Sequence, residues 1–276
     1  MSPRNKAPRF EEGAAQENQL RAARLSVALF FGIGLVVFFG VFGGLRIYSI
    51  VAGESGPPRA AIVDQLSLTF PNQDFIEEAT MTLERAGYVV DYYPGEEITV
   101  DFYRDLPEQN HDLVIFRAHA ARGVNAQAGA VTALFTSEPY DQMKHVDEQR
   151  ALRVGIAGYD ENDLEAEDGE SYFGIMPGFI ASGMSGDFDG ALVVLMGCEV
   201  LTSTELAQAF IDSGAEAVVG WDDTVSASHT DAATLNMLEH LVLEDLSLRE
   251  AAAVAMVEVG PDPFYDSVLV SYPPEG

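Results

Sequence analysis

The stretch ALVVLMGCEV, residues 191–200, contains the pattern from which the fold class is predicted. Its nearly continuous apolar run, residues 191–196, is typical of a strand that is buried on both faces in a parallel sheet. The stretch DLVIFR, residues 112–117, has the same character. Cys198 lies just beyond the later run and His119 just beyond the earlier one. The sequence therefore predicts two buried strands, each followed by a residue that can carry chemistry.

Strands and helices alternate along the rest of the globular part, which favours βαβ units and a doubly wound α/β sheet. Asn72 or Asp74, and Ser228 with Asp231, are typical helix starts, and Gly87 is a typical helix end. Strands are expected at residues 60–66, 88–93, 112–117, 130–136, 152–157, 191–196, 217–220 and 267–271. Helices are expected up to residue 85 and at residues 98–106, 203–213, 228–243 and 247–257. Seven acids between residues 160 and 170 are interpreted as a solvated loop.

Residues 25–45 form a run of 21 residues that contains no charged side chain. A hydrocarbon core of about 30 Å, crossed at 1.5 Å per residue, needs about 20 such residues, so this run predicts one transmembrane helix. Five basic residues precede the run, whereas Arg46 and Arg59 are the basic residues that closely follow it. By the positive-inside rule, we expect a single-pass protein of the cell membrane with a cytoplasmic N-terminus and an extracytoplasmic domain.

The expected organisation is a cytoplasmic tail at residues 1–24, a transmembrane signal anchor at 25–51, a linker at 52–59 and one globular domain at 60–276. A cleaved signal peptide is the alternative, but its apolar region would be only about 7–15 residues long. Gly40 and Gly44 form a GxxxG pair, which would let two membrane helices pack into a homodimer. Glycine is also common in membrane helices that do not pair in this way.

The formal net charge of −29 restricts the partners that the protein can bind. Such a surface repels the phosphates of nucleic acids, so nucleic-acid binding is not expected. Lys6 and Lys144 are the only lysines of the sequence. An acidic, lysine-poor composition indicates a halophilic protein, because high salt screens the self-repulsion of such a surface.

The sequence contains no motif for a metal or a cofactor. HExxH and CxxC spacings are absent, and so are the glycine-rich loops that bind nucleotide phosphates. A calcium loop within the acidic run is excluded because the apolar Leu164 and Ala166 would stand at ligand positions. Cys198 is the single cysteine, so no intramolecular disulfide can form.

Ligands and catalytic groups gather at the carboxyl ends of the strands in open parallel sheets. There Cys198 and His119 could form a nucleophile–base pair, in which the imidazole draws the thiol proton and the thiolate attacks a carbonyl. The helix expected after Cys198, from about residues 202–203, would present its positive N-terminal dipole to the thiolate. The alternatives are a small cysteine of the core and a histidine whose polar atoms are satisfied by the fold.

The residues around Cys198 also resemble a known family. The segment ALVVLMGCEV, followed by ELAQAFIDSGAEAVVGWDDTVS at residues 205–226, resembles the C-terminal half of CHAT domains. These domains share the caspase-like peptidase fold with gingipains, separases and metacaspases. The segment DLVIFRAHAARG, residues 112–123, resembles the strand that ends in the catalytic histidine of this group, and residues 263–265 (PFY) resemble a CHAT-like end. The resemblance covers roughly residues 60–273.

The resemblance implies a caspase-like three-layer sandwich with a mainly parallel sheet, preceded in this chain by one transmembrane helix. It implies that Cys198 is the nucleophile and His119 the general base. It also implies that the backbone N–H groups of Cys198 and Ala120 form the oxyanion hole. Ala120 departs from the glycine that follows the histidine in the family, and alanine does not accept every conformation open to glycine. Met196 stands where metacaspases have an acid, so a preference for arginine or lysine is not implied.

Asp222 and Asp223 follow the strand at residues 217–220, near the end of the sheet where a basic substrate side chain would lie. We expect them to contact the substrate, and the alternative is that they are turn and helix-cap residues of an acidic surface. The resulting hypothesis is a membrane-anchored cysteine peptidase that cleaves a protein or peptide substrate without a cofactor. The alternative is a catalytically silent CHAT-like sensor or protein-interaction module tethered to the membrane, which Ala120 and the lone oxidisable thiol favour.

Overall fold

The computed structural model describes residues 56–125, 129–158 and 171–274 of the chain. Residues 57–276 form one compact unit. The tail and the transmembrane helix expected from the sequence lie outside the described residues, and so does the acidic run at residues 160–170. Within the described ranges, no helix has both the length and the hydropathy needed to cross a membrane.

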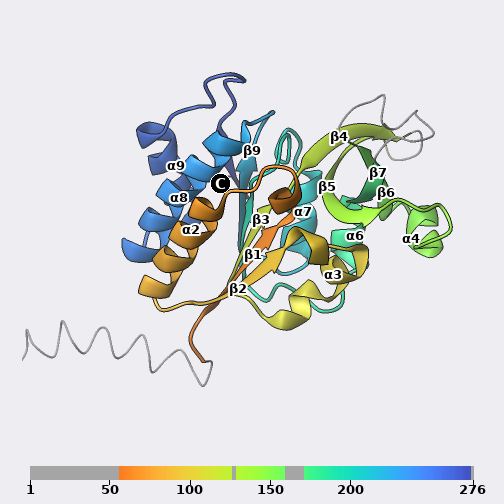
Figure 1. Cartoon of the computed structure of the whole chain (residues 1–276), viewed down its shortest axis with the longest axis horizontal. Coiled ribbons are helices and arrows are strands. Elements are labelled where there is room, and N and C mark those ends of the chain that lie inside the picture. Colours follow the sequence, from red (N-terminus) through yellow and green to blue (C-terminus); the bar gives the residue numbers. More distant parts are fainter. Residues whose placement is uncertain (1–55, 126–128, 159–170, 275–276) are drawn as a thin grey trace, which may run out of the picture. The chain divides into compact units, whose positions relative to one another are not determined.

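The centre of this unit is a six-stranded sheet, called sheet A here, with the strand order β10-β9-β8-β3-β1-β2 (Figure 1). Its strands are parallel except for the edge strand β10, which pairs antiparallel with β9. The bounds are β1 Arg59–Asp64, β2 Val89–Pro94, β3 Leu113–Arg117, β8 Leu192–Leu195, β9 Ala217–Trp221 and β10 Leu269–Tyr272. The prediction of an α/β fold with a mainly parallel sheet is confirmed.

Helices cover both faces of sheet A. One buried cluster joins the first face to helices α2 (Gln73–Arg85), α8 (Ala227–Leu243) and α9 (Leu248–Glu258), which lie together in Figure 1. A second cluster joins the other face to α3 (Val100–Asp105), α6 (Pro177–Ser182) and α7 (Glu205–Asp212). Along β3, Leu113 and Ile115 belong to the first cluster, whereas Val114 and Phe116 belong to the second. The near-continuous apolar run in the sequence follows from this burial on two faces.

Local signals set the ends of several helices as the sequence predicts. The side chain of Asn72 accepts a hydrogen bond from the backbone N–H of Phe75 at 3.2 Å and so caps α2. Gly87, with φ of +94°, follows the end of this helix. Ser247 begins α9 with a capping box that includes Glu250. These caps explain why the predicted boundaries lie within a residue or two of the observed ones.

A smaller sheet, called sheet B here, contains four antiparallel strands in the order β4-β5-β7-β6. The bounds are β4 Ala120–Asn125, β5 Gly129–Pro139, β6 Val154–Gly158 and β7 Ser171–Ile175, with the short helix α4 at Val146–Arg150. The strands expected at residues 130–136 and 152–157 are β5 and β6. The sequence patterns do not predict β4, β7, α4 or α6. β4 reads AARGVN and lacks apolar alternation, so its pairing with β5, rather than its own pattern, makes it a strand.

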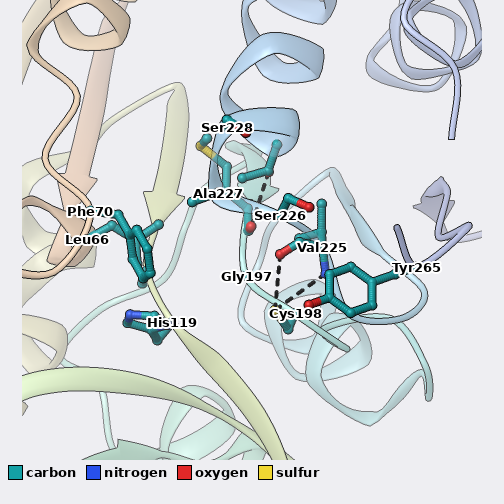
Figure 2. Close-up of a pocket in the computed structure, with 13 residues that line it drawn as sticks. Leu66, Phe70, His119, Gly197, Cys198, Val225, Ser226, Ala227, Ser228 and Tyr265 are labelled. Atoms are coloured by element: carbon teal, nitrogen blue, oxygen red, sulfur yellow. Dashed lines mark hydrogen bonds between the residues drawn. The ribbon is translucent and has the colours of Figure 1, made fainter. Parts of the chain in front are cut away.

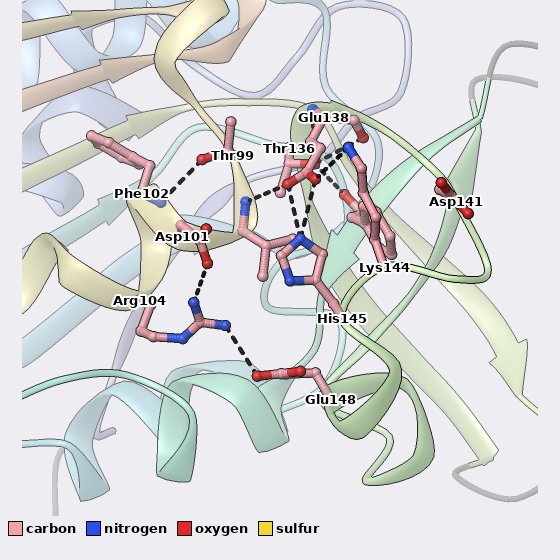
Figure 3. A network of polar contacts seen from close by, with 12 residues as sticks. Thr99, Asp101, Phe102, Arg104, Thr136, Glu138, Asp141, Lys144, His145 and Glu148 are labelled. Carbon is pink, nitrogen blue, oxygen red and sulfur yellow. Dashed lines mark hydrogen bonds and ion pairs between the residues drawn. The ribbon is translucent and has the colours of Figure 1, made fainter.

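A polar network attaches sheet B to helix α3 (Figure 3). The carboxylate of Glu138, at the end of β5, accepts from the backbone N–H of Val100 at 3.2 Å and pairs with His145 at 3.1 Å. Arg104 of α3 pairs with Glu148 of α4 at 3.0 Å. The side chains of Glu138 and His145 are only 13% and 14% exposed. Because these contacts are largely shielded from water, they hold sheet B against α3 more firmly than surface ion pairs would.

Candidate active site

A cavity of about 440 Å³ lies at the carboxyl ends of β3 and β8, and Cys198 and His119 both line it (Figure 2). The two strands are neighbours and pair from Leu113↔Leu192 to Phe116↔Leu195. His119 comes two residues after β3 and Cys198 three residues after β8, so both reach the same edge of sheet A. The structure thus brings these two residues, which the sequence singles out, into one cavity.

The walls of the cavity come from several parts of the chain. Residues 118–119 and 196–198 extend the two strands, and residues 225–228 lead into and begin α8. Phe70 comes from the segment after β1, and Tyr265 comes from the loop before β10. Phe70 and Tyr265 are each 53% exposed. Figure 2 shows Phe70 on the His119 side and Tyr265 on the Cys198 side, so aromatic rings that reach solvent border both residues.

The thiol of Cys198 is partly buried and is bonded to the backbone just before α8. Its Sγ accepts from the N–H of Val225 at 3.5 Å and donates to the carbonyl of Val225 at 3.6 Å. Burial raises the pKa of the thiol, and the negative charges of Glu199, Asp262 and Asp223 raise it as well, whereas the hydrogen bond from Val225 lowers it. The net shift is upward, so Cys198 is a protonated thiol at neutral pH.

The imidazole of His119 is held by contacts around its ring and its backbone. Its Nε2 lies 3.0 Å from Oγ1 of Thr69, and its ring meets that of Phe70 edge-on with 5.8 Å between centroids. The backbone N–H of His119 donates to Oε1 of Gln65 at 3.0 Å. Burial lowers the pKa of His119 to about 4, and the positive charge of Arg117 acts in the same direction. At neutral pH the ring is therefore uncharged, which is the form that can accept a proton.

The helix whose N-terminus reaches the cavity is α8 and not the helix that follows Cys198. α7 begins at Glu205 with Thr204 as its N-cap, two or three residues after the start expected near residues 202–203, and these residues are not among the described residues that line the cavity. α8 begins at Ala227, one residue before the start expected at Ser228, with Ser226 as its N-cap. Residues 225–228 line the cavity, so the positive end of the α8 dipole faces it. Since the pKa of Cys198 is nevertheless raised, burial and the nearby carboxylates outweigh this dipole.

Gly197 lets the ends of β3 and β8 approach each other closely. A Cβ added at this position would lie 2.7 Å from the carbonyl oxygen of Ala118 and 2.8 Å from Cβ of Ala120. Backbone atoms cannot yield to such contacts, so position 197 requires glycine. Ala120, the expected oxyanion-hole residue, is the first residue of β4 and is 6% exposed. Ala118 and His119, directly before β4, line the cavity, whereas Ala120 is not among the described lining residues.

Glu199, directly after the cysteine, joins the Cys198 turn to sheet B. Its φ is 54°, a left-handed conformation that reverses the chain sharply. Its Oε2 accepts from the backbone N–H of Arg122 at 3.2 Å, and its carbonyl accepts from Oγ1 of Thr132 at 3.0 Å. Its own N–H donates to the carbonyl of Asp223 at 3.0 Å. Contacts to both β4 and β5 therefore fix the turn that carries the thiol.

Asp222 and Asp223 form hydrogen bonds with the backbone near β9 and β10. Oδ1 of Asp222 accepts from the N–H of Val268 at 2.9 Å, and Oδ1 of Asp223 accepts from the N–H of Thr224 at 2.7 Å. Neither residue is among the described residues that line the cavity. These contacts correspond to the alternative interpretation of the pair as turn residues.

Asp262 is a buried acid beside the cavity that the sequence analysis misses. Its side chain is almost fully buried, with 1% of the residue exposed. Oδ2 accepts from the N–H of Ser226 at 2.8 Å, and Oδ1 accepts from the N–H groups of Phe264 and Tyr265 at 2.8 and 3.0 Å. Asp262 thereby holds Tyr265 beside the start of α8. The prolines on either side of Asp262 indicate a turn, but no pattern in the sequence predicts its contact with Ser226.

A buried charge cluster, called the Arg117 cluster here, lies next to the cavity. The guanidinium of Arg117 donates to Asp64 at 2.7 Å, to both oxygens of Asp231 at 2.7 and 2.8 Å, and to the carbonyl of Phe70 at 2.8 Å. Burial opposes the charged form of Arg117, but Asp231 and Asp64 raise its pKa above the ordinary value. Asn72 adds a bond to Asp231 at 2.8 Å. This cluster is not predicted from the sequence, because its hydrogen-bonded partners are up to 159 residues apart.

The described residues contain no group of three or more His, Cys, Asp or Glu side chains arranged to hold a metal ion. Comparison of the chain with protein-family models and with curated protein sequences finds no match to either.

Proposed function

We propose that the protein is a membrane-anchored, caspase/CHAT-like cysteine peptidase, with Cys198 as the nucleophile and His119 as the general base. The observation that carries this proposal is that Cys198 and His119 both line one cavity at the carboxyl ends of two adjacent parallel strands. Such strand ends are the usual site of catalytic groups in open parallel sheets. Helices on both faces of sheet A are also what a caspase-like three-layer sandwich requires.

The proposed reaction starts from two neutral groups. As the Sγ–H proton moves to the imidazole of His119, the sulfur of Cys198 attacks the carbonyl carbon of the substrate. The imidazolium then returns the proton to the leaving amine, the C–N bond breaks, and a thioester remains on Cys198. A water molecule, deprotonated by the same imidazole, hydrolyses this thioester, which releases a carboxylic acid and restores the thiol.

The lowered pKa of His119 keeps the ring uncharged at neutral pH, but it also makes the imidazole a weaker base than one that titrates near the operating pH. With a pKa of about 4, the ring is available to take a proton at every pH above that value. The backbone N–H groups of Cys198 and Ala120 are the proposed oxyanion donors, and Gly197 allows the close approach of the two strands that they require. The α8 dipole adds positive potential on the same side.

The proposed location is the cell membrane, with the apolar run at residues 25–45 as an uncleaved anchor, residues 1–24 in the cytoplasm and the domain outside. The proposed substrate is a protein or peptide. The high negative charge supports an environment of high salt and opposes anionic partners.

A catalytically silent sensor or interaction module is the second candidate, and a specific observation favours it. The thiol of Cys198 is protonated and is bonded to Val225 on both its donor and its acceptor side. A thiol in that state reacts slowly unless a base assists it.

The rate of Cys198 alkylation by iodoacetamide, measured against pH in the wild type and in His119→Ala, separates the two candidates. For the peptidase, we expect a wild-type rate that is higher by about 10²-fold, the lower end of general-base effects, and that falls only as the pH approaches 4. The single cysteine makes every adduct a Cys198 adduct. Equal rates in the two proteins across the pH range would reject the peptidase in favour of the silent module.

A further inference from the structure

The side chains that line the cavity are almost free of charge. Buried apolar groups come from Leu66, Met196 and Val225, and the half-exposed rings of Phe70 and Tyr265 border the cavity. The remaining polar groups near the start of α8 are hydroxyls. None of the lining residues that the structure describes is an aspartate, glutamate, lysine or arginine.

The acids closest to the thiol are engaged in bonds to the backbone. Both carboxylate oxygens of Asp262 accept from backbone N–H groups, and the residue is 1% exposed. One oxygen of Glu199 accepts from Arg122, and one oxygen of Asp223 accepts from Thr224. A cationic substrate side chain in the cavity would therefore lose water without gaining a carboxylate on the wall. Burial of an unpaired charge is strongly unfavourable.

An anionic side chain meets a second obstacle besides the missing partner. The chain carries a formal net charge of −29, and the three acids beside Cys198 add negative potential locally. An apolar side chain meets neither obstacle and would pack against the aromatic and aliphatic walls. A volume of about 440 Å³ falls within the usual range for pockets that bind small groups, roughly 300–1,000 Å³.

Resting on the proposed peptidase function, we infer that this cavity takes an uncharged, apolar side chain, such as leucine or phenylalanine, from the substrate residue whose carbonyl Cys198 attacks. Tyr265, Phe70 and Met196 are then the specificity-determining contacts. Asp222 and Asp223, which the sequence suggested for a basic substrate, have no part in this contact. The substrate class is thus a peptide cleaved after an apolar residue.

Four peptidyl acyloxymethyl ketones that differ only in the side chain beside the reactive carbonyl test this inference. The side chains are phenylalanine, leucine, arginine and aspartate, and the readout is the rate of Cys198 adduct formation on the full-length chain by mass spectrometry. We expect the phenylalanine and leucine probes to react at least about tenfold faster than the arginine and aspartate probes, a discrimination within reach of one apolar pocket.

Substitutions of residues that line the cavity test the same inference with the same probes. Tyr265→Ala should lower the rate with the phenylalanine probe by about tenfold, since it removes much of the apolar area that the probe would cover. Met143→Ala is the matched control, because Met143 is 76% exposed and is not one of the described residues that line the cavity. Ser228→Asp places a carboxylate on the wall in the first turn of α8, where the helix dipole favours it, and should raise the rate of the arginine probe.

Each outcome bears on a different statement. Equal rates for the four probes, or the highest rate with arginine or aspartate, would overturn the inference and leave the peptidase proposal standing. Failure of all four probes would also overturn the inference. The iodoacetamide comparison between wild type and His119→Ala then decides whether the proposed function falls with it.

Discussion

Two groups of polar residues lie at the same edge of sheet A, and they differ in almost every physical property. The Arg117 cluster holds a guanidinium and two carboxyl groups buried together, with side-chain exposures of 1%, 1% and 5% for Arg117, Asp64 and Asp231. The pair formed by Cys198 and His119 is uncharged at neutral pH and lies on the wall of a cavity.

This difference separates a structural role from a chemical one. Arg117 donates four hydrogen bonds to two carboxylates and a carbonyl, and its side chain is 1% exposed, so its guanidinium is not presented to a substrate. Its charges instead fix the ends of β1, β3 and α8, and with them the wall residue Phe70. Cys198 and His119 instead line the cavity, and the proposed reaction requires a proton to pass between them. The buried Arg117 cluster therefore supports the cavity, whereas the uncharged side chains of Cys198 and His119 line it.

Arg117→Met should have the largest effect on stability. The substitution leaves Asp64 and Asp231 buried without a counter-charge, and we expect a loss of about 3–5 kcal/mol in the free energy of unfolding. Urea unfolding of the full-length chain measures it. Arg85→Met, at the exposed end of α2, is the control and should cost less than about 0.5 kcal/mol. A loss below about 1 kcal/mol for Arg117→Met would mean that the cluster does not frame the site.

Acid should act on the other group through His119. The pKa of His119 is about 4 in the fold and about 6.5 in the unfolded chain, so the unfolded state binds a proton first as the pH falls. Stability is therefore lost between about pH 6.5 and pH 4, by at most ~3 kcal/mol. His119→Gln removes this contribution, and its stability should decline less than that of the wild type over this interval. Parallel curves for the two proteins would show that His119 is not held neutral.

Cys198→Ala should have the smallest effect. The side chain is only partly buried and its hydrogen bonds to Val225 are long, so we expect a loss of about 1 kcal/mol or less. Val193→Ala, at a fully buried position of β8, provides the comparison and should lose about 2 kcal/mol or more. If Cys198→Ala costs as much as Val193→Ala, the thiol belongs to the core and the contrast between the two groups fails.

The sequence predicts sheet A well and sheet B poorly, for a physical reason. Strands such as β3 and β8 are buried on both faces, and this burial leaves an apolar run that can be read directly. β4 and β7 become strands because neighbouring segments pair with them, and their own residues carry little of that information. Pairing between segments is a property of the fold and leaves only a weak trace in a single sequence.

The site is predictable to the same limited extent. His119 and Cys198 can be found because each follows a readable strand. Tyr265, Asp262 and the bonds of Arg117 cannot, because they depend on contacts between segments that are far apart in the chain. Asp222 is predicted to contact the substrate because it follows β9 in the sequence. Its side chain instead bonds to the backbone N–H of Val268, and it is not among the described residues that line the cavity.

The pairing of β3 with β8 also sets when the site can exist. Leu113 and Leu192 are register partners 79 residues apart, so their contact closes a long loop. Synthesis proceeds at about 5–20 residues per second, which places roughly 4–16 s between the appearance of His119 and that of Cys198. During this interval the growing chain contains His119 but no thiol. Cys198 and His119 can therefore line the same cavity only after β8 has been synthesised and has paired with β3.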